Sequence, residues 1–357
     1  LNHDMLVATW IGLAIGLFAF SFMAGDRPHA GLARLGFCAF ALGLLSKGLI
    51  GIALPGLVLL LWLLWTRQLK KVLHLPWLSG LGLFALIALP WFVLAQQRYP
   101  ALFDYLIVKQ HFQRYTGVQT NNPQPWWFYL LGLAVLLFPW ALLSLAALRR
   151  PGSRPLPPPS GEAALAPTWL SLCWIWVLSI TVFFSLPNSK LIGYALPVLA
   201  PLALLASLAW QQYIAPRRFA APLFVGLCLL NLALALALQW QLVVVTQCAR
   251  SQDVAGVLAC TARPPERVLV MDDFPYDLPF YAQTSRPLVA LGDWPALRTT
   301  APDGWQRELF EGANFDARAA QVLQPPAFLE AAATLPGHWL VLRNDNARRQ
   351  DLPGWVQ

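Results

Sequence analysis

The sequence has few charged residues. Asp, Glu, Lys and Arg make up 12% of its 357 residues, whereas a typical soluble domain has about 25%. Acidic residues are scarcer still in the first two thirds, since residues 1–245 carry 4 Asp/Glu against 15 Lys/Arg. With 57% hydrophobic residues and a mean hydropathy of +0.53, this composition excludes soluble, fibrous and disordered proteins and is typical of a polytopic membrane protein.

Two kinds of nucleotide-binding motif are also missing. The sequence has no glycine fingerprint between a strand and a helix and no Walker motif, so we expect no nucleotide cofactor. The positive charges stand in short loops between apolar runs, which gives no support to nucleic-acid binding.

Apolar runs long enough to cross a membrane recur along residues 1–245. They cover residues 5–24, 50–65, 77–96, 126–148, 169–186, 191–210 and 219–245, and a shorter run covers 32–45. About eight transmembrane helices are therefore predicted. Every second loop is rich in cations: Arg27 and Arg34; Arg67, Lys70 and Lys71; Arg149, Arg150 and Arg154; Arg217 and Arg218. The positive-inside rule makes these loops cytoplasmic, and this holds only if the short run crosses too.

Residues 246–357 differ in charge and pattern. They carry 10 Lys/Arg and 13 Asp/Glu, and short apolar runs at 267–271, 287–291 and 339–342 predict strands. Segments such as 316–323 are compatible with helices. We expect a small α/β domain on the periplasmic side, following a membrane body at 1–245 in which the proline-rich stretch 151–167 is a cytoplasmic connector. The pair Asp272 and Asp273 is interpreted as a loop or helix cap.

Two cysteines fall outside the predicted membrane helices. Cys248 and Cys260 are twelve positions apart, and a disulfide between them could persist in an oxidising compartment. Spacing alone does not decide whether the bridge forms.

Five cations of the body fall on the outer side: Lys47, Arg98, Lys109, Arg114 and Lys190. Lys47 ends one apolar run just before another, where an uncompensated charge is costly. Its partner could be Asp4 or a lipid phosphate; alternatively, Lys47 extends to water at a short turn. Clustered cations at the hydrocarbon edge are suited to a lipid phosphate.

The longest outer loop contains a candidate amphipathic helix at 104–115, which is either a membrane-surface helix or one wall of a pocket. On the pocket interpretation, Lys109, His111 and Arg114 receive an anionic headgroup or a metal ion. Lys190 and Tyr194 stand at the membrane boundary in another, very short loop, where Tyr194 could equally belong to an aromatic belt.

Several motifs in this order resemble one enzyme family. They are Ser-Lys-Gly at 46–48 before Leu-Pro at 54–55, His-Phe-Gln-Arg-Tyr at 111–115, Pro-Trp-Trp-Phe-Tyr at 125–129, Phe-Pro-Trp at 138–140, and Ser-Lys-Leu at 189–191 before Tyr-Ala-Leu-Pro at 194–197. These residues resemble the bacterial aminoarabinose transferases of lipid A. More broadly, they are similar to membrane glycosyltransferases of the GT-C fold, which include the protein O-mannosyltransferases.

The resemblance implies transfer of a sugar from a polyprenyl (undecaprenyl) phosphate carrier to a lipid A-like or protein acceptor on the periplasmic face of the bacterial inner membrane. It places Lys47 on the carrier phosphate with Arg114 and Tyr194 near it, and His111 in a divalent-metal site. Lys109 and Lys190 are added to the phosphate site from their position among the outer cations. Asp4 would be an auxiliary acid, because the family's principal catalytic carboxylate lies in the first outer loop. Since the sequence starts at Leu1 and that loop would precede it, we expect an N-terminal part to be missing and this fragment alone to be inactive.

Two other functions fit the same features. A non-enzymatic transporter or flippase of a lipid-linked sugar would use the same headgroup site, although transporters commonly have repeated halves and broken helices. A binding or scaffold protein with a degenerate site is the third interpretation.

Overall fold

The computed structural model describes residues 3–104, 106, 123–146, 166–247, 251–260, 267–271, 274–300, 306–333 and 337–342. The chain folds into two compact units, Leu1–Leu234 and Ala235–Gln357. The division falls inside one long helix, eleven residues before the boundary predicted from charge, which stays a prediction.

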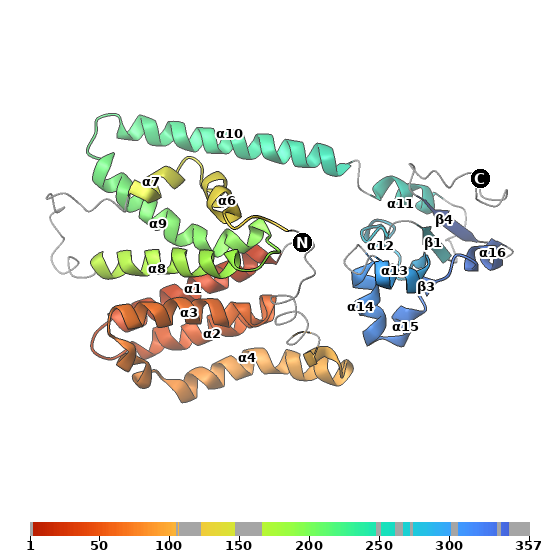
Figure 1. Cartoon of the computed structure of the whole chain (residues 1–357), viewed down its shortest axis with the longest axis horizontal. Helices are drawn as coiled ribbons and strands as arrows, with labels where there is room; N and C mark the ends of the chain where they lie inside the picture. Colours follow the sequence, from red (N-terminus) through yellow and green to blue (C-terminus); the bar gives the residue numbers. More distant parts are fainter. Residues whose placement is uncertain are drawn as a thin grey trace. The chain divides into compact units, whose positions relative to one another are not determined.

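The first unit is helical (Figure 1). Its elements are α1 Asp4–Met23, α2 Ala30–Lys47, α3 Ile50–Trp65, the 3-10 turn η1 Leu69–His74, α4 Trp77–Arg98, α6 Phe128–Leu136, α7 Ala141–Ala146, α8 Ala166–Ser185, the 3-10 turn η3 Ile192–Ala195, α9 Leu196–Tyr213 and α10 Ala220–Gln247, which continues into the second unit. Six of the helical segments in the described residues are long and apolar enough to cross a membrane, and α3 is a shorter apolar helix. The predicted polytopic α-helical membrane fold is confirmed.

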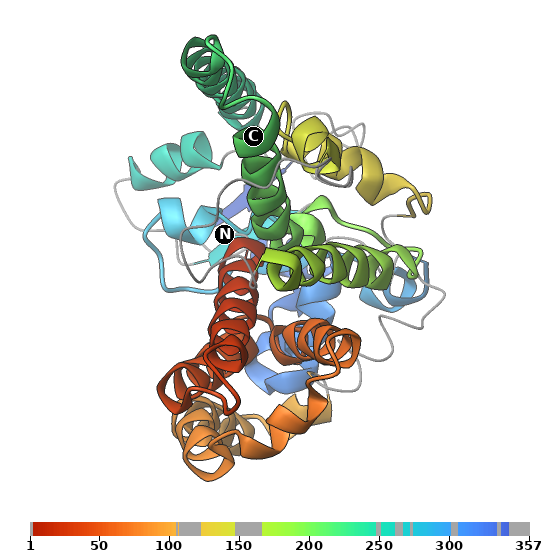
Figure 2. The same cartoon turned by 90° about the vertical axis from the view of Figure 1, so that its left-hand side faces the viewer.

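Helix α1 lies in the middle of this unit. It contacts α2, α3 and α9, and Figure 2 shows it between the orange pair α2–α3 and the green helix α9. Small residues let the helices approach. A Cβ added at Gly51 would collide with the backbone of Gly43, and one at Gly36 would meet the ring of Phe18. Close backbone approach through small residues is how helices pack when lipid removes the hydrophobic drive to associate.

The helix at Ala30–Lys47 crosses the unit, as the charge alternation requires. Because it crosses, the loop after α1 and the loop after α3 lie at the same end of the unit (Figure 1). The ammonium group of Lys71 joins the two loops by donating to the carbonyls of Phe22 at 2.8 Å and Gly25 at 2.7 Å. The loop between α9 and α10 is at this end too (Figure 1). The predicted grouping of these cationic loops is therefore confirmed.

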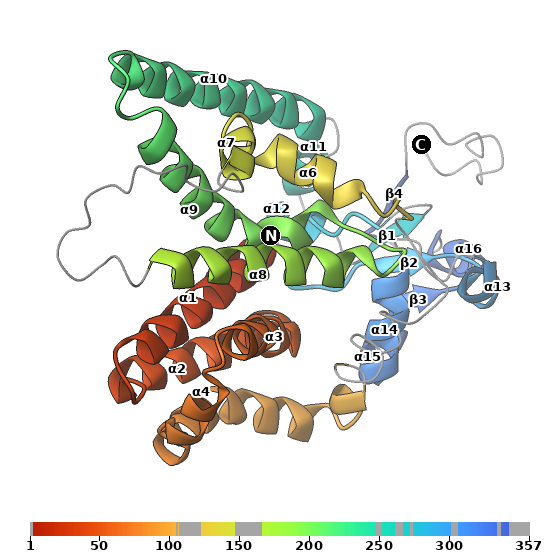
Figure 3. The same cartoon turned by 60° about the vertical axis from the view of Figure 1, so that its left-hand side comes forward.

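The single span predicted at 126–148 is wrong. The structure has two short helices there, α6 and α7, which point in different directions (Figure 3). The break lies at Pro139, which has no amide hydrogen and whose ring obstructs a continuous helix. Asn231 of α10 reaches the break: with its amide oriented to satisfy both partners, it donates to the carbonyl of Phe138 at 2.7 Å and accepts from the indole of Trp140 at 2.6 Å.

The second unit holds a four-stranded parallel sheet of order β3-β2-β1-β4. Its elements are α11 Gln252–Ala259, β1 Arg267–Met271, α12 Leu278–Tyr281, β2 Val289–Leu291, α13 Trp294–Thr300, α14 Arg307–Phe315, α15 Ala317–Ala320, β3 Leu323–Gln324, α16 Phe328–Ala333 and β4 His338–Val341. The three predicted strands are present, and the α/β prediction is confirmed.

Both faces of this sheet are covered. Val268 and Val270 of β1 pack in one apolar cluster with residues of α11–α14, whereas Leu269 between them packs in another with Leu329 of α16. Burial on both faces explains why the strands are continuous apolar runs and do not alternate with polar residues. The segment 316–323, expected to be helix-compatible, is helical only to Ala320. Its last residue, Leu323, pairs with Ala290 as the start of β3.

Candidate functional site

The turn between α2 and α3 places Lys47. Lys47 is the last residue of α2, and Gly48 caps the helix with φ 74°, a left-handed conformation that glycine adopts without strain. The Gly43–Gly51 approach then holds α3 directly against α2. A cation at a helix C-terminus also meets the negative end of the helix dipole.

Asp4 is the partner of Lys47. Its carboxylate makes an ion pair and hydrogen bond with the ammonium group. The Asp4 side chain is 7% exposed and that of Lys47 is 30% exposed. Asp4 lies in the first turn of α1, where the helix dipole favours an anion. Of the two partners that the sequence suggested for Lys47, the structure shows the carboxylate.

Tyr194 completes the cluster from the turn before α9. Its ring centroid lies 4.6 Å from the Lys47 ammonium nitrogen, within the range of a cation–π interaction. The ring also stacks on Phe184 of α8, with centroids 5.0 Å apart and 28° between the planes. The adjacent Gly193 touches Asp4 so closely that a Cβ would collide with the carboxylate.

These residues line a small cavity. Asp4, Lys47, Gly193 and Tyr194 provide its polar part, and the rest of its lining is apolar: Val7, Ile11, Ile50, Leu54, Phe184 and Pro197. At about 10 Å³ it has room for at most one water molecule. A phosphate would therefore approach Lys47 from its exposed side, where an ammonium with three donors can serve Asp4 and an anion together.

Lys190 is placed differently from the expectation of an outward cation. It is 3% exposed, and its ammonium nitrogen donates to the carbonyls of Gln124 at 3.0 Å and Pro187 at 2.6 Å. The structure brings Asp4, Lys47 and Tyr194 together, whereas the Lys190 ammonium group binds backbone carbonyls. Its role at the carrier phosphate stays a prediction.

The remaining expected site residues are only partly described. Lys109, His111 and Arg114 lie outside the described residues, as do most of the amphipathic segment 104–115, the connector up to residue 165 and the pair Asp272–Asp273. Cys260 is exposed. Because Cys248 lies outside the described part, their bridge stays a prediction.

No metal site is present among the described residues, in which no three His, Cys, Asp or Glu side chains lie together. The part of the chain that is described therefore does not by itself fit a divalent ion. The metal expected at His111 stays a prediction.

Sequence reasoning missed two contributors to the site. Gly193 matters because it leaves room for the Asp4 carboxylate, and Phe184 because it supports the Tyr194 ring. Gly193 lies between the Ser-Lys-Leu motif and Tyr194, but a glycine gives no signal of what will pack on it. Phe184 is one of two adjacent phenylalanines in an apolar helix and cannot be distinguished by type.

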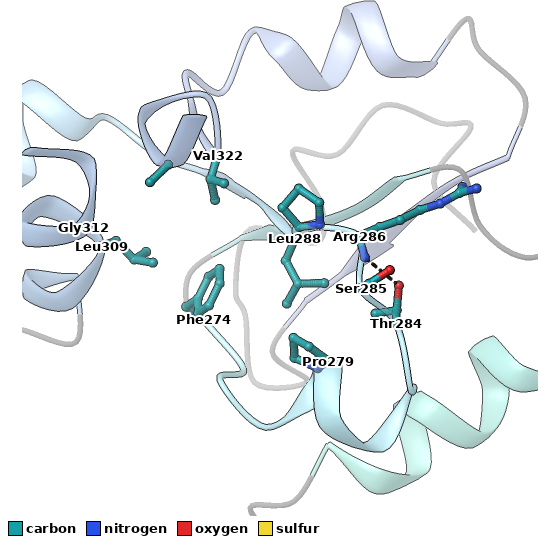
Figure 4. Close-up of a pocket in the computed structure, with 11 residues that line it drawn as sticks. Phe274, Pro279, Thr284, Ser285, Arg286, Leu288, Leu309, Gly312 and Val322 are labelled. Carbon is teal, nitrogen blue, oxygen red and sulfur yellow. Dashed lines mark hydrogen bonds between the residues drawn. The ribbon is translucent and has the colours of Figure 1, made fainter. Parts of the chain in front are cut away.

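A larger cavity, of about 360 Å³, lies in the second unit. Figure 4 shows Phe274, Pro279 and Leu288 around it, with Leu309 and Val322 on the opposite wall, whereas the Arg286 guanidinium extends away. Its volume falls in the range of small-molecule pockets. Its lining is mostly apolar, with Thr284, Ser285 and Arg286 as its polar residues and no carboxylate or imidazole among its described lining residues.

Comparison with known proteins agrees with the resemblance noted in the motifs. Residues 4–106 match the family model for dolichyl-phosphate-mannose-protein mannosyltransferase, a stretch that contains Asp4 and Lys47. The undecaprenyl phosphate-alpha-4-amino-4-deoxy-L-arabinose arabinosyl transferase of Pseudomonas paraeruginosa is 34% identical over 237 residues, which is 66% of this chain and 41% of that protein. A transferase of the same name from Shewanella sediminis is 31% identical over 57% of this chain and 35% of its own length.

Solved structures extend the similarity to nearly the whole chain. The crystal structure of ArnT from Cupriavidus metallidurans bound to undecaprenyl phosphate aligns with a TM-score of 0.70 and 22% identity, covering 96% of this chain and 70% of that one. The chain has the ArnT fold. The apo form of the same protein aligns with a TM-score of 0.68. The chain spans about two fifths of the length of the first of the curated relatives. With six helices in its described part that are long and apolar enough to cross a membrane, and with this fold, it is a multi-pass membrane protein.

Proposed function

We propose that this chain provides the carrier-phosphate site of a glycosyltransferase that moves a sugar from undecaprenyl phosphate to a lipid A-like or protein acceptor. The observation that carries the proposal is the cluster of Lys47, Asp4 and Tyr194, a partly exposed cation held at the end of a helix hairpin by a buried carboxylate. Supporting it, the curated relatives are named for an undecaprenyl phosphate-linked sugar, and ArnT was solved with undecaprenyl phosphate bound.

The chemistry needs what this cluster can supply. An acceptor oxygen attacks the anomeric carbon of the sugar, the bond between that carbon and the phosphate oxygen breaks, and the carrier phosphate leaves with the bonding electrons. The acceptor's proton passes to a general base. Lys47 neutralises the charge that develops on the leaving phosphate, a stabilisation worth about 10²–10³ in rate when a single well-placed donor is removed.

We further propose that the Lys47 end of the first unit faces the periplasm, with the second unit on the same side of the bacterial inner membrane. The cationic loops at the opposite end of the helices support this orientation, since such loops stay in the cytoplasm. The membrane itself supplies the donor and any lipid acceptor, so these partners reach the site by lateral diffusion.

The test uses the full-length protein in proteoliposomes with labelled undecaprenyl phosphate-aminoarabinose, and with either lipid A or an acceptor peptide. Lys47→Ala is expected to lower transfer about 10²-fold or more per folded, inserted molecule, with unchanged membrane insertion. Lys70→Ala is the matched control: it removes the same charge from an exposed position at the opposite end and should transfer at the wild-type rate.

Each outcome decides between the candidate functions. Full activity of Lys47→Ala overturns the site assignment. Movement of labelled carrier between leaflets without any glycosylated product favours the flippase instead. Product on the peptide rather than on lipid A selects the protein acceptor.

A further inference from the structure

The turn between α8 and α9 carries two residues of the Lys47 cluster, Gly193 and Tyr194. The only regular structure within this turn is one short 3-10 helix, η3, whose hydrogen bonds have poor geometry. Because these bonds hold the backbone of Tyr194 weakly, contacts from neighbouring segments are needed to fix its position. The structure shows contacts from residues 123–132, which precede and begin α6, at both ends of this turn.

The first contact is made by Lys190. The main chains pair as an isolated antiparallel bridge between Pro123 and Ser189, and the amide of Gln124 donates to the carbonyl of Asn188 at 3.1 Å. Across this bridge the buried Lys190 ammonium donates to the carbonyl of Gln124. A hydrogen bond from a charged donor is stronger than a neutral one, and more so away from water.

The second contact is made by Tyr129 of α6, a residue that is 1% exposed. Its hydroxyl donates to the carbonyl of Leu191 at 3.2 Å. Its ring lies 6.4 Å from that of Phe184, the residue that stacks on Tyr194. One turn further along α6, Gly132 leaves room for the side chain of Ile192.

We propose that residues 123–132 form a clamp that positions Tyr194 and Gly193 against Lys47 and Asp4, with Lys190 and Tyr129 as its positioning residues. This inference rests on the proposed function and deepens it, because it makes Lys190 a support of the phosphate site and not a ligand of the phosphate.

A reversible covalent bond can replace the Lys190 contact. Residues opposite each other in an antiparallel bridge have Cα atoms about 4.5–5.5 Å apart, which suits a disulfide. The experiment introduces Pro123→Cys and Ser189→Cys together into full-length protein, with and without Lys190→Met. The affinity for undecaprenyl phosphate and the donor KM and kcat are measured on the same sample, oxidised and then reduced.

Lys190→Met is expected to weaken binding of undecaprenyl phosphate about tenfold or more. Oxidation of the double-cysteine background should return the affinity to within about threefold of wild type, and reduction should abolish the rescue. Tyr129→Phe, which removes one neutral hydrogen bond, should weaken binding about three- to fivefold. The single-cysteine variants are the matched controls and should show no redox effect.

Three results would overturn the clamp: no cross-link between the two cysteines, an unchanged affinity in Lys190→Met, or a lost affinity that the cross-link does not restore. The last would mean that Lys190 contacts the phosphate itself. If the wild-type protein neither binds undecaprenyl phosphate nor transfers sugar, the proposed function fails. The clamp is then still decided by the cross-linking yield and by whether Lys190→Met exposes the turn at 186–195 to proteolysis.

Discussion

The pairing of Lys47 with Asp4 leads to a quantitative prediction about stability. Two unit charges at a normal contact of about 2.8 Å attract by about 6 kcal/mol at an effective dielectric constant near 20. Removing the groups from water costs several kcal/mol in return. The Lys47 side chain is 30% exposed and the Asp4 side chain only 7%, so most of this desolvation cost comes from burying the Asp4 carboxylate. We expect a net coupling of about 2 kcal/mol.

The two single substitutions should not be equivalent. Lys47→Met leaves a buried carboxylate without its cation and should lower the free energy of unfolding by about 3–5 kcal/mol. Asp4→Asn should cost about 1–2 kcal/mol less than this, because the long Lys47 stem can carry its charge to water. The double variant should cost less than the sum of the two, and the difference is the coupling energy.

The measurement is a double-mutant cycle on the full-length protein, unfolded reversibly in mixed micelles by rising SDS and followed by circular dichroism. The pair Arg307 and Glu311, spaced i,i+4 on α14 with a 2.9 Å contact, is a control whose coupling should be only about 0.3–0.5 kcal/mol. A coupling below about 0.5 kcal/mol at Asp4–Lys47, or a larger cost for Asp4→Asn than for Lys47→Met, would refute the reasoning.

Two further predictions concern packing. Gly51→Ala drives a Cβ into the backbone of Gly43 and should cost about 1–3 kcal/mol in the same unfolding assay. Gly56→Ala on the same helix meets open space and should be neutral or stabilising; equal losses in both would contradict a specific approach of α2 and α3. In the second unit, Leu269→Ala empties a fully buried position and should destabilise by about 3 kcal/mol. The exposed Val257→Ala should change stability by less than about 0.5 kcal/mol, and chemical denaturation followed by tryptophan fluorescence would show whether the two differ.

The membrane architecture could be predicted from local patterns. Apolar runs of sufficient length predicted the helices, and the alternation of cations identified the short run at 32–45 as a crossing, which the Lys71 contacts confirm. The strands of the second unit could be predicted as well, since a parallel sheet buried on both faces produces uninterrupted apolar runs. The prediction of a single span at 126–148 was wrong. A hydropathy profile measures only how apolar a segment is, and it does not show that the chain breaks at Pro139 into two helices.

The candidate site could be predicted only in part. The sequence identifies Lys47, because a cation between two apolar runs needs a partner, and it offers Asp4 and a lipid phosphate as alternative partners. Lys190 carries the same charge in a similar position, yet the structure turns it inward onto carbonyls. Charge and sequence spacing are the same kind of signal for Lys47 and Lys190, so they do not predict which of the two lysines pairs with a carboxylate. Only the neighbouring chain decides whether an ammonium finds an anion or a set of carbonyl oxygens.

The sequence by itself determined that this protein spans a membrane several times, that the cationic loops after α1, α3 and α9 lie at one end, and that a small α/β unit follows, because hydropathy and charge act along the chain. The tertiary structure alone decided that Asp4, Lys47 and Tyr194 meet, that Gly193 leaves room for a carboxylate, and that Tyr129 and Lys190 hold the turn that carries Tyr194. These residues come from different helices and turns, and their contacts depend on how side chains fill the space between those elements. No periodicity of a single segment contains that information.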